Sequence, residues 1–311
     1  DSTIAPGSGQ FLTTLGTVSL IKSASTVSLL TLASRITGML RDVLMNSAFG
    51  VSAWTDAFWV AFRIPNMFRR LFAEGAFSQA FVPVLAASKE RDGEAATHAL
   101  IDSVATLLTL ALVVTCVVGI VGAPVLVYVL ASGLPADGFS AAVHLTRWMF
   151  PYIACMSLVA LGAGVLNTWK NFAIPAATPV LLNVAMISAA WLGAPWLGSL
   201  GVQPIYAMAA GVMGGGALQL GAIWWAMQRR GLAPRLRLSV AGARAAWAQP
   251  DTRRIVQLMG PALLGVSVSQ ISLLINTQIA SHLGTGSVTW LNNASLLMEF
   301  PTAMLGVALG V

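Results

Sequence analysis

Charged side chains are scarce in this sequence. They make up 9% of its 311 residues, whereas the set AVILMFWYC makes up 57%. A soluble domain carries about 25% charged residues, with which it covers its surface. So few charges exclude an ordinary soluble protein, and we expect this chain to lie in a membrane.

Cysteine and histidine are also scarce. Cys116 and Cys155 each lie within a long apolar run, and neither has another cysteine or a histidine at ligand spacing. His98, His144 and His282 are scattered among the connections between such runs. This pattern excludes a disulfide framework and a zinc motif, so we expect no metal and no cofactor.

Eight apolar runs have about the length of 20 residues that a helix needs to cross a bilayer. They lie approximately at Val18–Phe49, Thr55–Ala87, Leu100–Leu130, Trp148–Trp169, Ala176–Leu192, Ile205–Met227, Ile255–Ser281 and Trp290–Val311. The predicted fold is therefore an all-α polytopic membrane protein. Its expected parts are an N-terminal coil (1–17), a six-helix lobe (18–228), a basic linker (229–254) and the first two helices of a second lobe (255–311). Since no charge follows the last run, we expect a piece of a longer protein.

The connections between these runs alternate in basic charge. Lys and Arg are absent from four of them, Gly50–Trp54, Ala131–Thr146, Gly193–Pro204 and His282–Thr289. The intervening connections carry Lys89 and Arg91, then Lys170, then the seven arginines of the linker, 229, 230, 235, 237, 244, 253 and 254. Short cytoplasmic loops collect Lys and Arg, so the N-terminus is predicted to be cytoplasmic.

The arginine-rich linker has two possible partners. With Trp247 among its arginines, it suits an amphipathic segment lying on anionic lipid headgroups. Nucleic acid would need the same charge, but no nucleic-acid-binding fold accompanies it. We therefore expect anionic membrane lipids and no nucleic acid.

The first two predicted helices carry an unusual number of ionisable residues. An ionisable group at bilayer depth costs roughly 2.5–3.5 kcal/mol on insertion scales and usually faces a cavity or a partner. The eight are Arg35, Arg41, Asp42, Asp56, Arg63, Arg69, Arg70 and Glu74. Six polar residues of the second helix follow one helical face, namely Asp56, Arg63, Asn66, Arg70, Glu74 and Ser78.

Two interpretations of these charges remain open. Arg70 with Glu74, and Arg41 with Asp42, have the spacing of local ion pairs. Arg35 has no acid within four residues, which favours a cavity role. Because the guanidinium group forms a planar fork for phosphate, the substrate of such a cavity is expected to be an anion that bears phosphate.

The glycine cluster at residues 211–216 has a simpler interpretation. No strand precedes it and no Gly-Lys-Ser/Thr follows it, so it does not predict a phosphate loop. Gly211 and Gly215, four residues apart, instead predict close packing against another helix.

Several motifs together resemble the bacterial MurJ (MviN) lipid II flippase family. They are Ser34–Gly38, Arg41-Asp42, Thr55–Phe58, Arg63–Pro83, Leu166–Trp169, Gly260–Ala262, Gly265–Gln270 and Met298–Pro301. The block in the second helix is the most specific, and the resemblance extends from about Ser19 to the end. The family belongs to the multidrug/oligosaccharidyl-lipid/polysaccharide exporters and has fourteen helices, of which this chain would supply about eight.

The resemblance implies a transporter of the bacterial inner membrane, not an enzyme. It would move undecaprenyl-pyrophosphate-linked peptidoglycan precursor, lipid II, from the cytoplasmic to the periplasmic leaflet by alternating access, for cell-wall biogenesis. The resemblance places the substrate arginines at Arg35, Arg41 and Arg69 and the accompanying acids at Asp56 and Glu74. Arg63 and Asn66, on the polar face, complete the expected substrate-binding set.

One position departs from the family pattern. The segment that usually reads Tyr-Tyr-Ala-Asp-Arg-Leu is Asn292–Leu297 here, which puts Leu296 where the family has an essential arginine. A transport-impaired protein is therefore one alternative. Another is a related polysaccharide-lipid or cation-coupled multidrug exporter, which would favour acids in its cavity. A membrane enzyme would need a nucleophile or an acid and base, and no His or Cys lies near the arginine cluster in the sequence.

The alternation of charge predicts which connections face the outside. Cysteines introduced at Ala136 and Gly198 should react with an impermeant thiol reagent added outside the inner membrane, whereas a cysteine at Ala243 should not. Labelling at Ala243 in sealed cells would contradict the predicted orientation.

Overall fold

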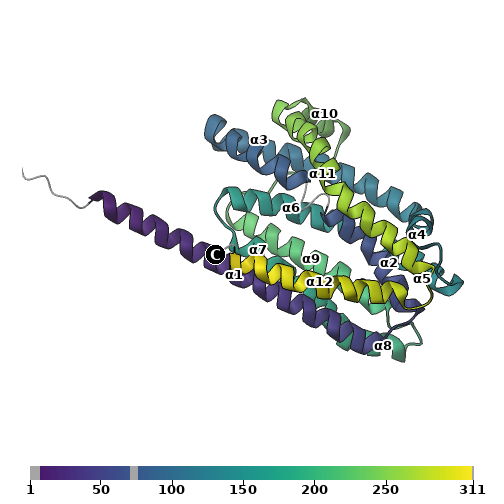
Figure 1. Cartoon of the computed structure of the whole chain (residues 1–311). Helices are drawn as coiled ribbons and strands as arrows, with labels where there is room; N and C mark the ends of the chain where they lie inside the picture. Colours follow the sequence, from purple (N-terminus) through teal and green to yellow (C-terminus); the bar gives the residue numbers. More distant parts are fainter. Residues whose placement is uncertain (1–7, 71–75, 310–311) are drawn as a thin grey trace, which may run out of the picture.

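The protein is an all-helical bundle (Figure 1), here a computed structural model that describes residues 8–70 and 76–309. Within those ranges every regular element is a helix. In chain order these are α1 (Ser8–Phe49), α2 (Ala53–Phe68), α3 (Phe77–Val121), α4 (Ala123–Ala131), α5 (Ala136–Met149), α6 (Tyr152–Thr168), α7 (Ala173–Ser188), the π-helical turn η2 (Ala189–Gly193), α8 (Ala194–Ser199), α9 (Tyr206–Arg229), α10 (Val240–Ala248), α11 (Pro250–Ser281) and α12 (Ser287–Leu309). The predicted all-α class is confirmed.

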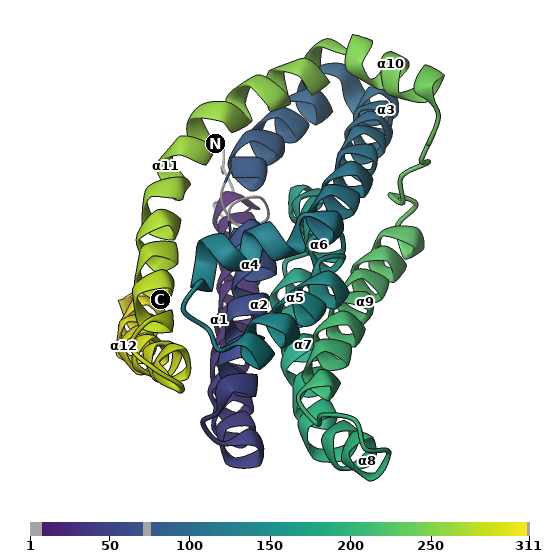
Figure 2. The same cartoon turned by 90° about the vertical axis from the view of Figure 1, so that its right-hand side faces the viewer.

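The helices form two groups, and the second packs on the first mainly through α3, α4 and α2. In the first group, α7 packs between α1 and α9, α2 packs on α5, and α3 packs on α6. In the second, α11 leaves α10 beside α3 and runs past the end of α4 to α12, which lies against α1 and α2. Figure 2 shows α11 as an arc separated from α1 along its middle. Residues of α1, α2 and α11 line a cavity, which is described below.

Sequence and structure agree on the cores of the helices more than on their ends. The predicted coil at 1–17 is wrong from Ser8 onward, because α1 begins there. The predicted connections at Ser88–Ala99 and Ala131–Thr146 are largely helical, because α3 continues through a kink at Gly93 (φ 79°) and α5 begins at Ala136. The count of apolar residues predicts the part of each helix that is apolar enough for lipid. Polar residues continue several of these helices beyond that part.

Four described segments are long and apolar enough to cross a membrane. They are Phe77–Val121, Ala136–Thr168, Ala173–Ser199 and Tyr206–Arg229, and a bent pair within α11 would add a fifth. The chain is a multi-pass membrane protein, and the number eight stays a prediction. The shortness of α2, at 16 residues, is one reason that the described segments fall short of eight.

The structure separates the two kinds of connection to opposite ends of the bundle. At one end the basic connections meet: Lys89 lies 4.1 Å from the centre of the Trp169 ring, and Arg91 pairs with Asp251 at 3.0 Å. At the other end the connections without Lys or Arg meet, where the Gly133 amide donates to the Ser281 hydroxyl at 3.2 Å. The charge pattern therefore corresponds to a physical polarity of the bundle.

The predicted glycine packing is confirmed. A Cβ atom on Gly211 would lie 2.7 Å from the Cβ of Ala189, and one on Gly215 would lie 2.9 Å from the Cα of Leu182. Backbone contacts this close leave no room for a side chain, and they bring α9 against α7 and η2.

Gly215→Val should therefore destabilise the bundle, since its branched side chain would collide with the α7 backbone at Leu182. Overpacking of this kind costs about 1–3 kcal/mol. Gly221→Val is the matched control, because Gly221 lies in the same helix and a Cβ there meets nothing within 4 Å. Thermal unfolding of both variants in the same detergent measures the difference, and equal loss of stability would contradict the packing account.

Candidate functional site

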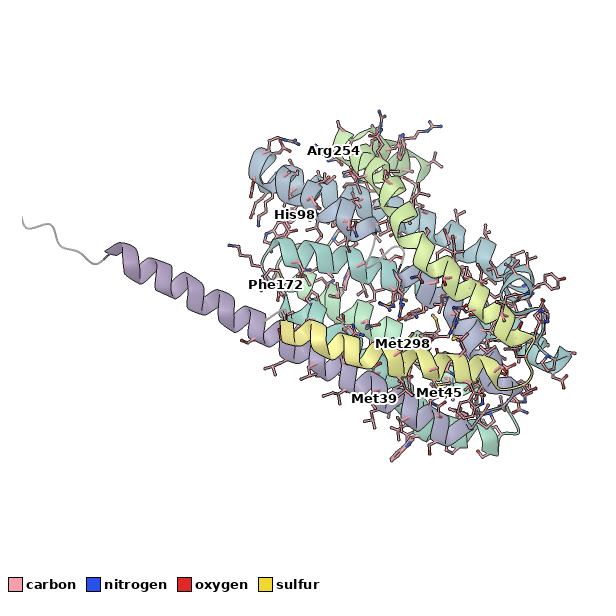
Figure 3. All side chains as sticks on the ribbon, viewed as in Figure 1. Met39, Met45, His98, Phe172, Arg254 and Met298 are labelled. Carbon is pink, nitrogen blue, oxygen red and sulfur yellow. The ribbon has the colours of Figure 1, made fainter. Side chains whose placement is uncertain are left out.

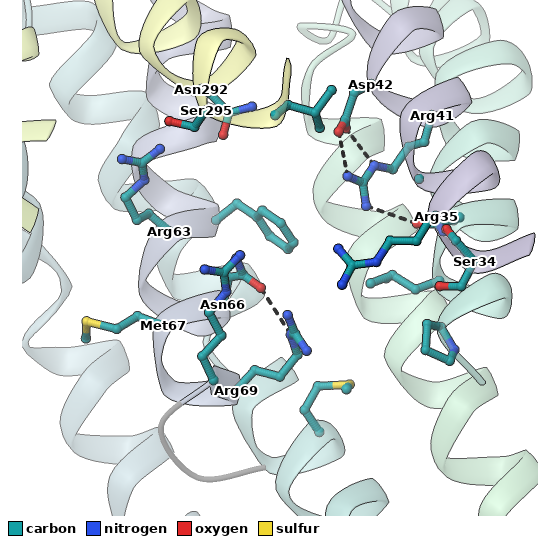
Figure 4. A pocket seen from close by; sticks show the side chains of 18 of the residues that line it. Ser34, Arg35, Arg41, Asp42, Arg63, Asn66, Met67, Arg69, Asn292 and Ser295 are labelled. Atoms are coloured by element: carbon teal, nitrogen blue, oxygen red, sulfur yellow. Dashed lines mark hydrogen bonds and ion pairs between the residues drawn. The ribbon is translucent and has the colours of Figure 1, made fainter. Parts of the chain in front are cut away.

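A cavity of about 1080 Å³ lies between α1, α2, α7, α9, α11 and α12. Five arginines line it (Figure 4), two from α1 and three from α2 and the turn directly after it: Arg35, Arg41, Arg63, Arg69 and Arg70. Asn66 also lines it. The structure thus brings together five of the seven residues predicted for the substrate site.

Helix α2 is held in register by its first turn. The Ser52 side chain accepts the Thr55 amide at 3.3 Å, and the Thr55 hydroxyl accepts the Ser52 amide at 2.8 Å, which is a capping box. From this start, residues 55–65 are all buried. The end of α2, which carries Asn66 and precedes Arg69, reaches the cavity.

Arg41 is the most firmly positioned of the cavity arginines. It forms a bidentate pair with Asp42, with Nε–Oδ1 at 2.7 Å and Nη2–Oδ2 at 2.8 Å, and its Nη1 donates to Asn183 Oδ1 at 3.0 Å. The Asn183 amide nitrogen in turn donates to the Ser34 carbonyl and the Thr37 hydroxyl, each at 3.0 Å. The predicted pairing of Arg41 with Asp42 is confirmed, and a network between α1 and α7 holds Arg41.

Arg35 has a different environment. Its side chain is exposed, and it makes no hydrogen bond or ion pair with any residue of the described ranges. Arg69 approaches from α2, where its Nε donates to Asn66 Oδ1 at 3.1 Å. In Figure 4, Arg35 and Arg69 both point into the space between α1 and α2.

The charge of the cavity is unbalanced among the described residues. Asp42 is the one carboxylate that lines it there, against five arginines. Five minus one leaves four positive charges in excess. An anion in this space would meet several guanidinium groups at once, and charge-assisted hydrogen bonds of that kind are the strong ones.

Arg63 connects the two groups of helices. It is 7% exposed, and its Nη1 donates to the Thr277 hydroxyl of α11. Asn292 and Ser295 of α12 line the same cavity as Arg63 (Figure 4). Arg63 thus belongs both to the cavity and to a contact between α2 and α11.

Asp56 does not line the cavity, which departs from its predicted place in the substrate site. It is 1% exposed and accepts the Gly286 amide at 2.5 Å, the Thr289 amide at 2.8 Å and the Thr289 hydroxyl at 2.6 Å. A carboxylate there satisfies amides at the start of α12 and complements the helix dipole. The regular spacing of the polar face could not reveal this partner, because α12 lies 230 residues away in the chain.

Three further positions complete the comparison with the sequence. Glu74, and hence its predicted pairing with Arg70, lies outside the described residues. Leu296 lines the cavity from α12. Sequence reasoning missed Asn183, 5% exposed, although an amide within the apolar run Ala176–Leu192 was a usable signal.

The sequence matches known proteins along most of its length. The family model described as lipid II flippase MurJ matches residues 45–311. The chain is 52% identical over 295 residues to the lipid II flippase MurJ of Burkholderia cenocepacia, which covers 94% of this chain and 56% of that protein. It is 39% identical to the probable lipid II flippase MurJ of Vibrio cholerae, covering 93% of this chain and 55% of that protein. The chain thus spans about half the length of these curated relatives.

Solved structures share the fold. A lipid II flippase MurJ in an inward closed conformation superposes with a TM-score of 0.71 at 24% identity, covering 88% of this chain and 54% of the other. A transporter of the MOP superfamily from Pyrococcus furiosus gives a TM-score of 0.66 at 14% identity, covering 93% and 62%. At these identities the likeness concerns the fold alone.

The environment of Asp56 generates a test of the contact between α2 and α12. Asp56→Ala leaves the Gly286 and Thr289 amides without their acceptor, and an unsatisfied buried donor costs about 1–3 kcal/mol. Hydrogen exchange of these two amides should become faster, and the protein should unfold at lower temperature. Asp137→Ala, at an exposed site in the first turn of α5, is the control and should change neither. Unchanged exchange at both amides in Asp56→Ala would contradict the capping role.

Proposed function

The chain belongs to the lipid II flippase MurJ family, and from this premise we propose that it forms the first part of a transporter that moves lipid II across the bacterial inner membrane. The substrate is undecaprenyl-pyrophosphate linked to the peptidoglycan disaccharide-pentapeptide. The direction is from the cytoplasmic to the periplasmic leaflet, by alternating access and without covalent catalysis. The observation that carries the proposal is the cavity with five arginines and one described carboxylate.

The arginines suit the pyrophosphate group of this substrate. Arg35 and Arg69 point into the cavity and supply planar forks that match phosphate oxygens. Arg41 adds charge from a fixed position, because Asp42 and Asn183 hold it. We assign binding roles to these three arginines, with Arg63 and Asn66 beside them. Glu74 retains its role as an accompanying acid on the strength of the family resemblance alone.

Alternating access fits the contacts at the end of the bundle where the connections between helices lack Lys and Arg. There Asp56 caps α12, the Ser132 amide donates to Gln278 at 3.0 Å, and Arg63 bonds Thr277 nearby. Each contact joins α1–α9 to α11 or α12. Opening the cavity toward this end requires these hydrogen bonds to break, so they act as a closed gate in this conformation.

The orientation follows from the distribution of basic residues. With the N-terminus in the cytoplasm, the end that carries Lys89, Arg91 and the linker faces the cytoplasm. All seven linker arginines are exposed, and Trp247 is 47% exposed. We assign anionic headgroups of the inner leaflet as the partners of this linker.

A related exporter is the alternative function. Structures of a MOP transporter and of a multidrug MATE transporter, with a TM-score of 0.62 for the latter at 17% identity over 93% of this chain and 62% of the other, share the fold. A cavity that captures a cationic drug needs acidic side chains. The described lining residues here include one carboxylate, that of Asp42, and it is already paired with Arg41. The charge therefore favours an anionic substrate.

Removing the cavity arginines tests the proposal. In a full-length chimera, this chain would replace the matching part of the Burkholderia cenocepacia relative. Arg35→Ala, Arg41→Ala and Arg69→Ala should each abolish rescue of a flippase-depleted strain without lowering the amount of protein in the membrane, because each removes a charge from the pyrophosphate site. Arg254→Ala, at an exposed linker position outside the cavity, is the control and should rescue. Full rescue by all three cavity variants would refute the binding roles.

Leu296 generates a second test in the same chimera. It lines the cavity where the family pattern has an arginine. One charge-assisted hydrogen bond is worth about 1.5–3 kcal/mol, so Leu296→Arg should strengthen lipid II binding roughly tenfold or more and improve rescue, with Ser295→Asp as an added partner. Equal binding and rescue by the Leu296 and Arg forms would show that this position is not part of the substrate site in this chain.

A further inference from the structure

A second cavity lies outside the arginine site, on the outer surface of the helix bundle. Its volume is about 1200 Å³, and residues of α5, of the segment from α7 to α8, and of α9 line it. Figure 2 labels these four helices. Apolar side chains form nearly all of its lining, including Trp148, Leu192, Trp196 and Leu218. It shares no lining residue with the arginine cavity.

Small residues form the floor of this groove. On α9 they recur every three or four positions, at Ala207, Ala210, Gly211, Gly214 and Ala217. Gly211 is used for packing against η2, but a Cβ on Gly214 would meet nothing within 4 Å. The α9 surface of the groove therefore has free space at Gly214, although the neighbouring glycines of α9 are packed against other helices.

Large side chains form the walls, and they are exposed. Trp148 is 62% exposed, Trp196 63% and Leu192 74%. Tryptophan prefers the boundary between hydrocarbon and headgroups, and Trp196 lies in a connection at the end of the bundle without Lys or Arg. The exposed walls indicate that the groove opens to lipid, and Trp196 indicates that it does so near a membrane boundary.

One basic residue, Arg147, lies on α5 next to the groove-lining segment, although it does not itself line the groove. Arg147 is the single Lys or Arg between residues 131 and 169, and none occurs from 171 to 228. It is exposed and has no hydrogen-bond or ion-pair partner within the described part of the chain. It is adjacent to the groove residue Trp148 and one turn from the groove residue His144.

His144 is a second polar group of the groove, and it lines the groove directly. Its Nδ1 lies 2.8 Å from the Ser140 carbonyl, so Nδ1 donates to that carbonyl. Asp137, the nearest acid in the sequence, lies ten residues before Arg147, so it is three helical turns away.

We propose that this groove binds one anionic glycerophospholipid. An acyl chain occupies the apolar trough over Gly214, and the phosphate pairs with Arg147. Charge complementarity identifies the occupant, because an arginine without a counter-ion at membrane depth is costly and a neutral lipid would leave it so. The site is separate from the proposed transport activity, and it would hold α5 against α9 where no protein side chain fills the space.

The test uses the chain itself, purified into nanodiscs that contain equal amounts of phosphatidylglycerol and phosphatidylcholine. Native mass spectrometry counts the lipids that remain bound after release. The wild-type protein should retain phosphatidylglycerol about fivefold over phosphatidylcholine, the ratio expected for one basic residue near a lipid phosphate. Arg147→Gln should reduce that ratio to about one.

Filling the trough separates this site from general lipid contact. Gly214→Leu should remove the bound lipid, and Ala217→Leu is a second filling variant in case the first unfolds. Gly221→Leu is the matched control, because a Cβ at Gly221 also meets open space but Gly221 does not line the groove; it should retain lipid as the wild type does. Equal retention by a folded filling variant, no preference for phosphatidylglycerol, or equal loss in the Gly221→Leu control would each overturn the proposal.

Discussion

The central physical constraint on this structure is the positive charge of one cavity inside a membrane bundle, where the described lining residues supply fewer carboxylates than arginines. Five arginines line one cavity, and within the described residues a single aspartate accompanies them. Such groups are tolerated at bilayer depth when water or an anion reaches them. The cavity between α1, α2 and the arc of α11 supplies that space. Met39 of α1 and Met298 of α12, both labelled in Figure 3, also line it. The proposed anionic substrate follows from this excess.

The two buried aspartates of the first helices have different tasks. Asp42 belongs to the cavity wall, where it fixes the guanidinium of Arg41 without cancelling the remaining arginines. Asp56 leaves the cavity and binds the start of α12, so its charge closes the interface between the helix groups. One acid thus positions a cavity arginine, and the other joins α2 to the start of α12. In the proposed transporter, opening the cavity at this end would break the contact of Asp56 and leave the pair of Arg41 and Asp42 in place.

The sequence predicted the fold class, the cavity arginines and the glycine packing, because these depend on residue type and helical spacing. It could not predict that Asp56 caps α12, since that contact joins segments 230 residues apart. It also missed the helical extensions at α1 and α5, where residues outside the apolar runs continue a helix. The sequence also could not predict the proposed lipid groove. The small residues of α9 recur at one helical spacing, but the contacts with neighbouring helices determine which of them are packed and which are open.

The most direct test of the central claim is a cryo-electron microscopy structure of the full-length chimera with lipid II in a nanodisc. Excess positive charge between α1 and α2 should place the pyrophosphate density between Arg35 and Arg69, within hydrogen-bonding distance of both, with Arg41 in its present position beside Asp42. Lipid II bound elsewhere, with the guanidinium groups of Arg35 and Arg69 facing water or paired with carboxylates, would contradict the account.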